Sequence, residues 1–142
     1  MPMATNEVTI ERSPEEVFAF LADGENDGRW RPGVLDVARV SGEGVGAFYR
    51  QGVRGPMGRR VAADYRVTEY EPGRALAFDV AGGPVRPRGR FDLSPAPGGT
   101  RVRFTLESEL SGVKRVLMAR MVARTMAAEV GNLSRLKEVL EG

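Results

Sequence analysis

Apolar and polar residues alternate with a period of two through most of residues 34–110, and clusters of Gly and Pro separate the short apolar runs. This pattern predicts a meander of six antiparallel strands. Residues 100–107 show it most clearly, because their apolar side chains share one face of the strand, namely Val102, Phe104 and Leu106. A similar alternation over residues 4–11 predicts one further strand, which gives a sheet of seven strands.

Two short helices are predicted between the first strand and the meander. Ser13, Pro14 and Glu16 form a capping box with Pro at the first helical position, and an apolar stripe follows them. Residues 25–33 are rich in turn-forming residues around Trp30, the only Trp of the chain. This second segment predicts one more helical turn before the meander begins.

A long helix is predicted after the meander. The chain contains no Pro from Ser111, a candidate N-cap, to Glu141. Apolar residues at helical spacing give this helix one face for packing against the sheet, formed by Met118, Val122, Met126, Leu133, Leu136 and Leu140. Gly131 interrupts the stripe and predicts a bend or a close backbone contact there.

Five short motifs stand in order along the chain: SPEEVFAFLAD at 13–23, WRPG at 30–33, VTEYEPGRALAF at 67–78, PGGTRVRFTLE at 97–107 and NLSRLKEVLE at 132–141. Together with the predicted elements, they resemble the helix-grip fold of the START-like (SRPBCC) superfamily, particularly its polyketide cyclase/dehydrase-like branch. The resemblance implies a single START-like domain over residues 1–142. Its α+β fold would wrap a curved antiparallel sheet of seven strands around the long C-terminal helix.

Composition narrows the chemistry. With no Cys and no His, the chain has no thiolate nucleophile, no disulfide, no imidazole base and no Cys or His metal site, so we expect neither a metal nor a cofactor. The net charge of +2 does not by itself favour nucleic acid as a partner. The N-terminal residues lack the features of a signal peptide, and no apolar run is long enough to span a membrane. We therefore expect a cytoplasmic monomer or homodimer.

The resemblance also implies a cavity between the sheet and the last helix, which holds lipids, sterols, polyketides or hormones in this superfamily. Candidate ligand-binding residues are those that the strand and helix periods turn toward it. The candidates from the sheet and the second short helix are Trp30, Tyr49, Tyr65 and Phe78, with Gln51 and Glu69 as further inward polar residues. Those from the last helix are Met118, Met121, Val122 and Thr125. For Trp30 and the methionines, plain core packing is the alternative.

Glu129 is the remaining candidate, because it projects close to the centre of the apolar stripe of the last helix. A carboxylate at such a position is unfavourable unless it is paired. Two alternatives follow. Glu129 either forms an ion pair with an Arg, or faces the cavity unpaired with a raised pKa and acts on a ligand as a neutral acid.

Three functions remain open from the sequence. The first is binding of an apolar or aromatic small molecule, lipid-like or polyketide-like, in the cavity. The second is a cyclase or dehydratase that uses the same cavity, for which Tyr, Glu and bound water would have to supply the chemistry. The third is an adaptor that uses the Arg-rich hairpins at 54–60 and 86–90, which requires an unneutralised basic patch. The absence of His favours binding over catalysis.

Overall fold

The computed structural model describes residues 3–81, 86–108 and 113–142, without the side chains of 56 and 113–118. The strands are β1 (Met3–Ile10), β2 (Val34–Ser41), β3 (Phe48–Arg54), β4 (Arg60–Ala62), β5 (Tyr65–Glu71), β6 (Ala75–Val80), β7 (Arg88–Ala96) and β8 (Gly99–Glu107). The helices are α1 (Pro14–Ala22), α2 (Asp27–Trp30), α3 (Val113–Gly131) and α4 (Leu133–Glu141). Two short 3₁₀ turns, η1 (Gly24–Asn26) and η2 (Pro56–Gly58), complete the described elements.

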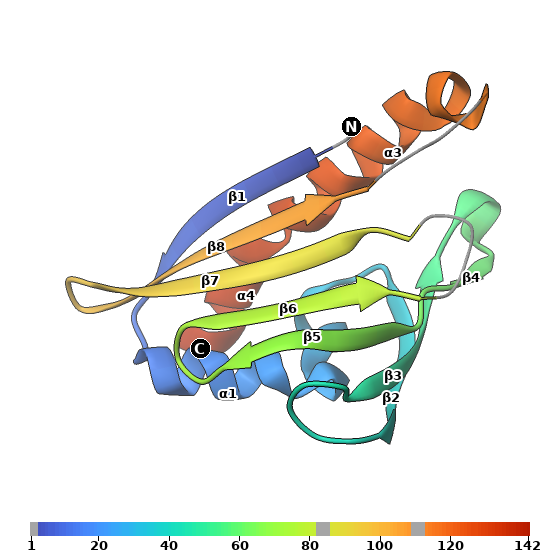
Figure 1. Ribbon diagram of the computed structural model, residues 1–142. Helices are drawn as coiled ribbons and strands as arrows, with labels where there is room; N and C mark the ends of the chain where they lie inside the picture. The colour runs from blue at the N-terminus through green and yellow to red at the C-terminus, as the bar shows by residue number, and fades with distance from the viewer. Residues whose placement is uncertain (1–2, 82–85, 109–112) are drawn as a thin grey trace.

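The strands form one curved antiparallel sheet in the order β1-β8-β7-β6-β5-β3-β2, and β4 pairs with β3 beside this path (Figure 1). The predicted α+β helix-grip fold is therefore confirmed, with one short strand more than expected. The extra strand is β4, which residues 63–64 separate from β5. At the division, the Ala63 amide donates to the Gln51 carbonyl, and Asp64 Oδ1 accepts from the Gln51 amide at 3.0 Å.

The Ser13 cap predicted for the first helix is present, and the Glu16 carboxylate accepts from the Ser13 hydroxyl. Ser13 Oγ accepts a hydrogen bond from the Glu16 amide at 3.2 Å, and Pro14 occupies the first helical turn. α1 then packs against β6, β7 and β8 on the concave face of the sheet. This packing buries its apolar residues Val17, Phe18 and Leu21.

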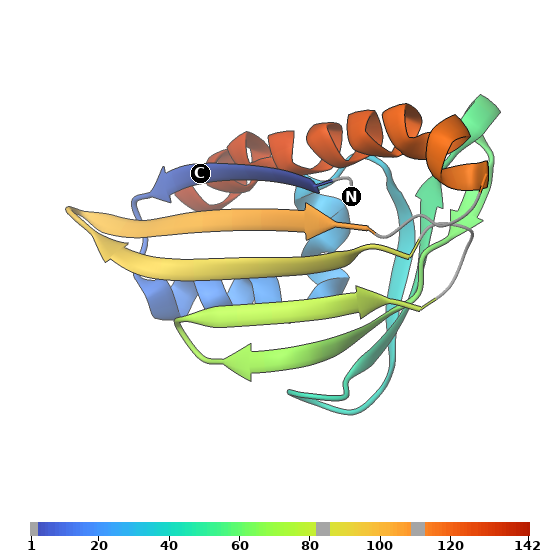
Figure 2. The same ribbon diagram turned by 45° about the horizontal axis from the view of Figure 1, so that its top comes forward.

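The long C-terminal helix is interrupted at Asn132, directly after Gly131, where a bend was predicted. α3 runs along β1 and β8, and α4 continues along β1 and also contacts α2 (Figure 2). Leu133 and Leu136 at the start of α4 have no exposed surface. The last helix therefore closes one side of the concave face in two segments. The predicted N-cap, Ser111, lies outside the described residues.

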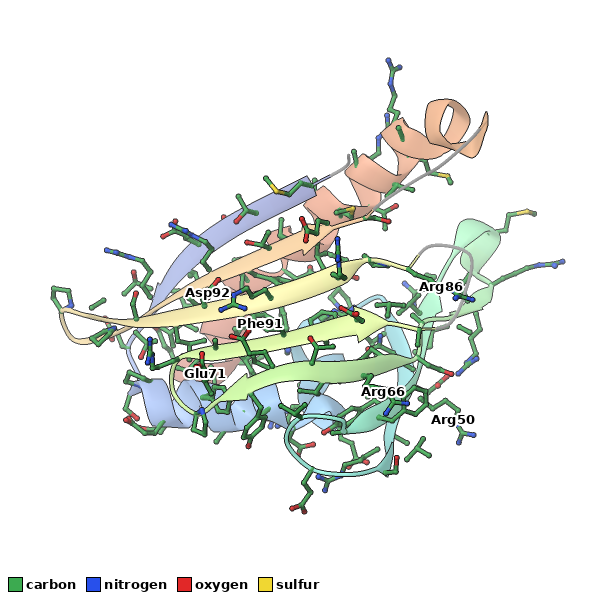
Figure 3. The ribbon with its side chains drawn as sticks, in the orientation of Figure 1. Arg50, Arg66, Glu71, Arg86, Phe91 and Asp92 are labelled. Atoms are coloured by element: carbon green, nitrogen blue, oxygen red, sulfur yellow. The ribbon has the colours of Figure 1, made fainter. Side chains whose placement is uncertain are left out.

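The core fills the space between the concave face and the helices. Phe91 on β7 and Phe104 on β8 stack with their ring centroids 4.3 Å apart, and Trp30 approaches both rings edge-on. Figure 3 labels Phe91 together with its neighbour Asp92, which pairs with Arg90 on the outer face of the sheet. The face predicted for residues 100–107 is thus confirmed as the inner face of β8, where Val102, Phe104 and Leu106 are buried.

Glu69 does not face inward, which corrects the prediction from strand alternation. The register of β5 against β6 shifts between Val67 and Glu69, and this irregularity reverses the alternation beyond it. Tyr70 consequently packs edge-on against Phe18 of α1, while Glu69 pairs with Arg90 on the outer face at 2.9 Å.

Replacing Leu136 by Ala should lower the free energy of unfolding by about 2–5 kcal/mol, because it leaves a cavity where α4 meets the core. The neighbouring change Arg135→Ala alters an exposed position and should cost under about 0.5 kcal/mol. Chemical denaturation of both variants measures the difference. Equal effects would contradict the burial of α4 against the sheet.

Candidate functional site

A small cavity lies between the concave face of the sheet and the α1–α2 region. Aromatic and aliphatic side chains form most of its wall, which consists of Leu21, Ala22, Asp27, Trp30, Arg31, Tyr49, Tyr65, Val67, Leu76, Phe78, Phe91 and Phe104. Its volume is about 20 Å³, room for about one water molecule. Sites for drug-sized ligands measure roughly 300–1,000 Å³, so the cavity is closed in this conformation.

Two tyrosines form one polar edge of the cavity. The rings of Tyr49 and Tyr65 stack with centroids 4.9 Å apart, which places both hydroxyls near the turn before α2. Tyr65 Oη donates to Asp27 Oδ2 at 3.0 Å, and Tyr49 Oη donates to the Ala22 carbonyl at 3.3 Å. The turn contains Gly24, where a Cβ atom would collide with both tyrosine side chains. Glycine at this position therefore permits the close approach of the turn to the two rings.

Arg31 lies beside this edge and joins three elements. Its Nε donates to Glu129 Oε2 on α3 at 2.7 Å, and its Nη1 donates to Gln51 Oε1 on β3 at 3.3 Å. The same Nη1 lies 3.6 Å from Asp27 Oδ2, four residues earlier in the chain. Glu129 thus forms an ion pair with an arginine, which confirms the paired alternative and excludes an unpaired neutral acid in this conformation.

The burial of these groups changes how they titrate. Desolvation raises the pKa of Asp27 to about 6, although Arg31 and the Tyr65 hydroxyl act in the opposite direction. Desolvation and the adjacent Asp27 carboxylate raise the pKa of Tyr65 well above its usual value. Burial alone would lower the pKa of Arg31, but Glu129 and Asp27 outweigh it, and the net shift is upward. Asp27 is therefore the group in this cluster that gains or loses a proton near neutral pH.

Trp30, a residue of the cavity wall, carries an unpaired hydrogen-bond donor. Its side chain is 2% exposed, and its indole N–H is buried without a hydrogen-bond acceptor. A buried donor without an acceptor is unfavourable by about 1–3 kcal/mol. Any bound molecule or water that supplies an acceptor oxygen would remove this penalty.

The structure places the predicted site residues in different surroundings. The cavity was expected between the sheet and the last helix, but no described residue of α3 or α4 lines it, because α1 and α2 cover this part of the concave face. Four of the predicted residues line the cavity that is present: Trp30, Tyr49, Tyr65 and Phe78. Glu129 adjoins it through Arg31, and Val122 is buried in the core without lining it. The side chain of Met118 lies outside the described residues. Ligand contact by any of these residues remains a prediction.

Met121 and Thr125 are corrections to the prediction, because neither faces the cavity. Met121 is 51% exposed, and Thr125 is exposed with its hydroxyl donating to the Met121 carbonyl one turn earlier. The reason is the rotation of α3 about its axis. Val122, Met126 and Val130 face the sheet, and this stripe turns Met121 and Thr125 toward solvent.

Asp27 and Arg31 are site residues that sequence reasoning missed. Arg31 belongs to the WRPG motif, but no role had been assigned to it. Their spacing of four residues across a predicted helical turn was the available signal, because such pairs share a helix face. The sequence did not indicate that this face would be buried rather than solvated.

The described residues hold no cluster of three acidic side chains that could bind a metal ion. None of the helices within them is long and apolar enough to cross a membrane.

A family model described as "Polyketide cyclase / dehydrase and lipid transport" matches residues 1–141. The chain belongs to this family, which confirms the resemblance and indicates hydrophobic ligand binding. Uncharacterised proteins of Mycobacterium bovis and Mycobacterium tuberculosis are 29% identical over 114 residues, which span 78% of this chain and 67% of theirs. These relatives extend the family resemblance without naming a ligand.

Solved structures share the whole fold. The protein TTHA0849 from Thermus thermophilus is 26% identical, with a TM-score of 0.81 over 96% of this chain and 95% of its own. The di-domain ARO/CYC StfQ from the steffimycin biosynthetic pathway has a TM-score of 0.82 at 13% identity, over 98% of this chain and 50% of its own. A START superfamily protein from Mycobacterium smegmatis has a TM-score of 0.75 at 19% identity, over 98% of this chain and 97% of its own. The last two likenesses show the fold alone.

Asp27 should make stability depend on pH. Its pKa is about 6 in the folded protein and near 3.8 in the unfolded chain, so the folded state binds more protons between these values. The free energy of unfolding should therefore fall as the pH rises through this window, by a few kcal/mol at most. Asp27→Asn should remove this component. Denaturation of both proteins at pH 4 and pH 7 measures it, and an identical pH dependence would contradict the raised pKa.

Proposed function

We propose that the protein binds an apolar or aromatic small molecule, lipid-like or polyketide-like, in the cavity between the sheet and the α1–α2 region. The observation that carries this proposal is the composition of the cavity wall. Aromatic rings from α2, β3, β5, β6, β7 and β8 line one cavity, and such a wall suits a flat apolar ligand. The family description, which includes lipid transport, supports the same class of ligand.

The polar edge of the cavity further defines the ligand. Trp30 supplies an N–H without an acceptor, so a ligand oxygen that accepts a hydrogen bond would be favoured beside it. Arg31 already faces two carboxylates, those of Glu129 and Asp27. A third carboxylate would meet a site in which the positive charge is already balanced, so a neutral ligand fits better than an anionic one.

A dye-binding experiment tests the proposal. The neutral dye Nile red should bind at one site and fluoresce in the apolar cavity. Val67→Phe adds volume to the cavity wall and should weaken binding by about tenfold or more, at a stability cost of about 1–3 kcal/mol. Met121→Phe, at an exposed position on α3, is the matched control and should leave binding unchanged. Equal binding by both variants would place the dye elsewhere and refute the proposed cavity.

The alternative function is catalysis of the cyclase or dehydratase type, and the Asp27–Tyr65 pair favours it. An acid with a pKa near 6, hydrogen-bonded to a phenol inside an aromatic cavity, can exchange a proton with a bound ketone or enol near neutral pH. The likeness of fold to StfQ, an ARO/CYC protein, is compatible with such a role. The absence of His makes this pair the best-placed acid and base at the cavity.

For the catalytic alternative, a poly-β-ketone thioester serves as test substrate, and cyclised or dehydrated product is followed by mass spectrometry. Asp27→Asn should reduce turnover by about 100-fold or more, while Nile red binding is retained. Asp23→Asn, an exposed acid in the preceding turn, is the control. Turnover that survives Asp27→Asn, or the absence of any turnover by the unaltered protein, would leave binding as the function.

The adaptor function is disfavoured by the charges of the outer surface. Arg60 pairs with Asp36, Arg90 with Glu69, and Arg103 with Glu7. Figure 3 shows Arg50, Arg66 and Arg86 at one end of the sheet, but these few cations would contact only a few phosphates. We therefore propose a small molecule, and not nucleic acid, as the partner.

A further inference from the structure

Residues 27–31, which carry Trp30 and are called the Trp30 segment below, are connected to distant parts of the protein by side-chain contacts. The segment consists of the four-residue helix α2 and Arg31, whose carbonyl accepts from the nearby Val34 amide at 3.0 Å. Within the described residues, its long-range polar contacts come from the side chains of Asp27 and Arg31, which bond to Tyr65, Gln51 and Glu129.

Trp30 is one of the largest side chains in the cavity wall. Its ring centroid lies 6.0 Å from that of Phe91 and 6.1 Å from that of Phe104. Since the cavity holds only about one water molecule, a ligand can enter only if a large side chain moves. The unpaired indole N–H adds a reason for Trp30 to move, because this donor gains a water partner when the wall opens.

The charges of the Trp30 segment also suit it to moving as a unit. Asp27 and Arg31 are four residues apart within it, with Nη1 and Oδ2 3.6 Å apart. When the segment moves, Arg31 keeps this carboxylate, so the guanidinium is never left without a counter-charge. Three contacts must break when the segment moves: the hydrogen bond of Asp27 with Tyr65, that of Arg31 with Gln51, and the 2.7 Å ion pair of Arg31 with Glu129. The ion pair is the only one of the three between two charged groups, and the Glu129 side chain is 21% exposed and accessible to water.

We propose that the Trp30 segment is a movable wall of the cavity and that the Arg31–Glu129 ion pair is the latch that holds it closed. The purpose of this motion, the admission of a ligand, rests on the proposed function. The motion itself is a property of the protein without ligand. In the closed state the latch is formed and Trp30 is buried, and in the open state both the indole N–H and the cavity are accessible.

Hydrogen exchange of the Trp30 indole N–H tests the motion directly. The chain has a single Trp, so this proton gives the one indole signal in the spectrum of the ¹⁵N-labelled protein. In the unaltered protein, the indole N–H should exchange at least about tenfold faster than the backbone amide of Phe104 on β8, after correction for intrinsic rates. Its rate should also be insensitive to low concentrations of guanidinium, as expected for a local opening.

Three variants separate the latch from general stability. Glu129→Gln should accelerate indole exchange by about tenfold or more, because a hydrogen bond between charged groups is lost from the closed state only. Glu138→Gln, an exposed acid on α4, should leave it unchanged. Ile10→Val weakens the core at a fully buried position of β1, so it should accelerate the Phe104 amide but leave the indole N–H unchanged.

The proposal is overturned if the indole N–H exchanges as slowly as the Phe104 amide, or if Glu129→Gln leaves its exchange unchanged. If Glu129→Gln does not fold, the unaltered protein and Ile10→Val decide the question. A movable wall requires the Trp30 indole N–H to exchange by a local opening and the Phe104 amide to exchange by a larger unfolding. Nile red takes no part in these measurements. If the indole N–H exchanges by local opening but the protein binds no dye, the proposed function is refuted and the latch is retained. If the protein binds the dye but the indole N–H shows no local opening, the latch is refuted and the proposed function is retained.

Discussion

Burial of the Arg31 guanidinium is the constraint on which the arrangement of the site depends. A guanidinium remains charged under all conditions in which the protein is folded, so it must be surrounded by partners. Those partners come from three elements, with Asp27 on α2, Glu129 on α3 and Gln51 on β3. One side chain thereby links the C-terminal helix, the second short helix and strand β3 in the closed structure.

A polar cluster of this kind is a poor way to stabilise a core. Ion pairs in protein interiors are often neutral or unfavourable compared with apolar side chains of the same size, because both charges lose their hydration. The aromatic rings around the cluster already provide apolar packing, as the stacked Phe91 and Phe104 show. The cluster nevertheless adjoins the cavity, with Asp27 and Arg31 in its wall, and burial raises the pKa of Asp27 to about 6.

The sequence allowed the sheet, its inner faces and the first helix to be predicted, because each depends on local periodicity or on a local cap. The capping box at Ser13 and the alternation along β8 are examples. Features that depend on tertiary contacts were not predictable in the same way. The irregularity after Val67 reversed the orientation of Glu69, and the rotation of α3 turned Met121 and Thr125 outward. Glu129 was recognised as a residue in need of a cation, but its partner lies 98 residues away in the chain.

The pairing of β1 with β8 bears on how the protein is made. All eight residues of β1 pair with β8, and the Glu11 amide donates to Glu141 Oε2, 130 residues later. During synthesis β1 can therefore pair only after β8 has been made, and it gains its helix contacts only after α4 has been made. Contacts between residues so far apart in the chain favour slow folding. Until α4 has left the ribosome, the aromatic concave face has no complete cover. The concave face that is buried in the finished protein is thus, in the nascent chain, an exposed apolar surface that favours aggregation.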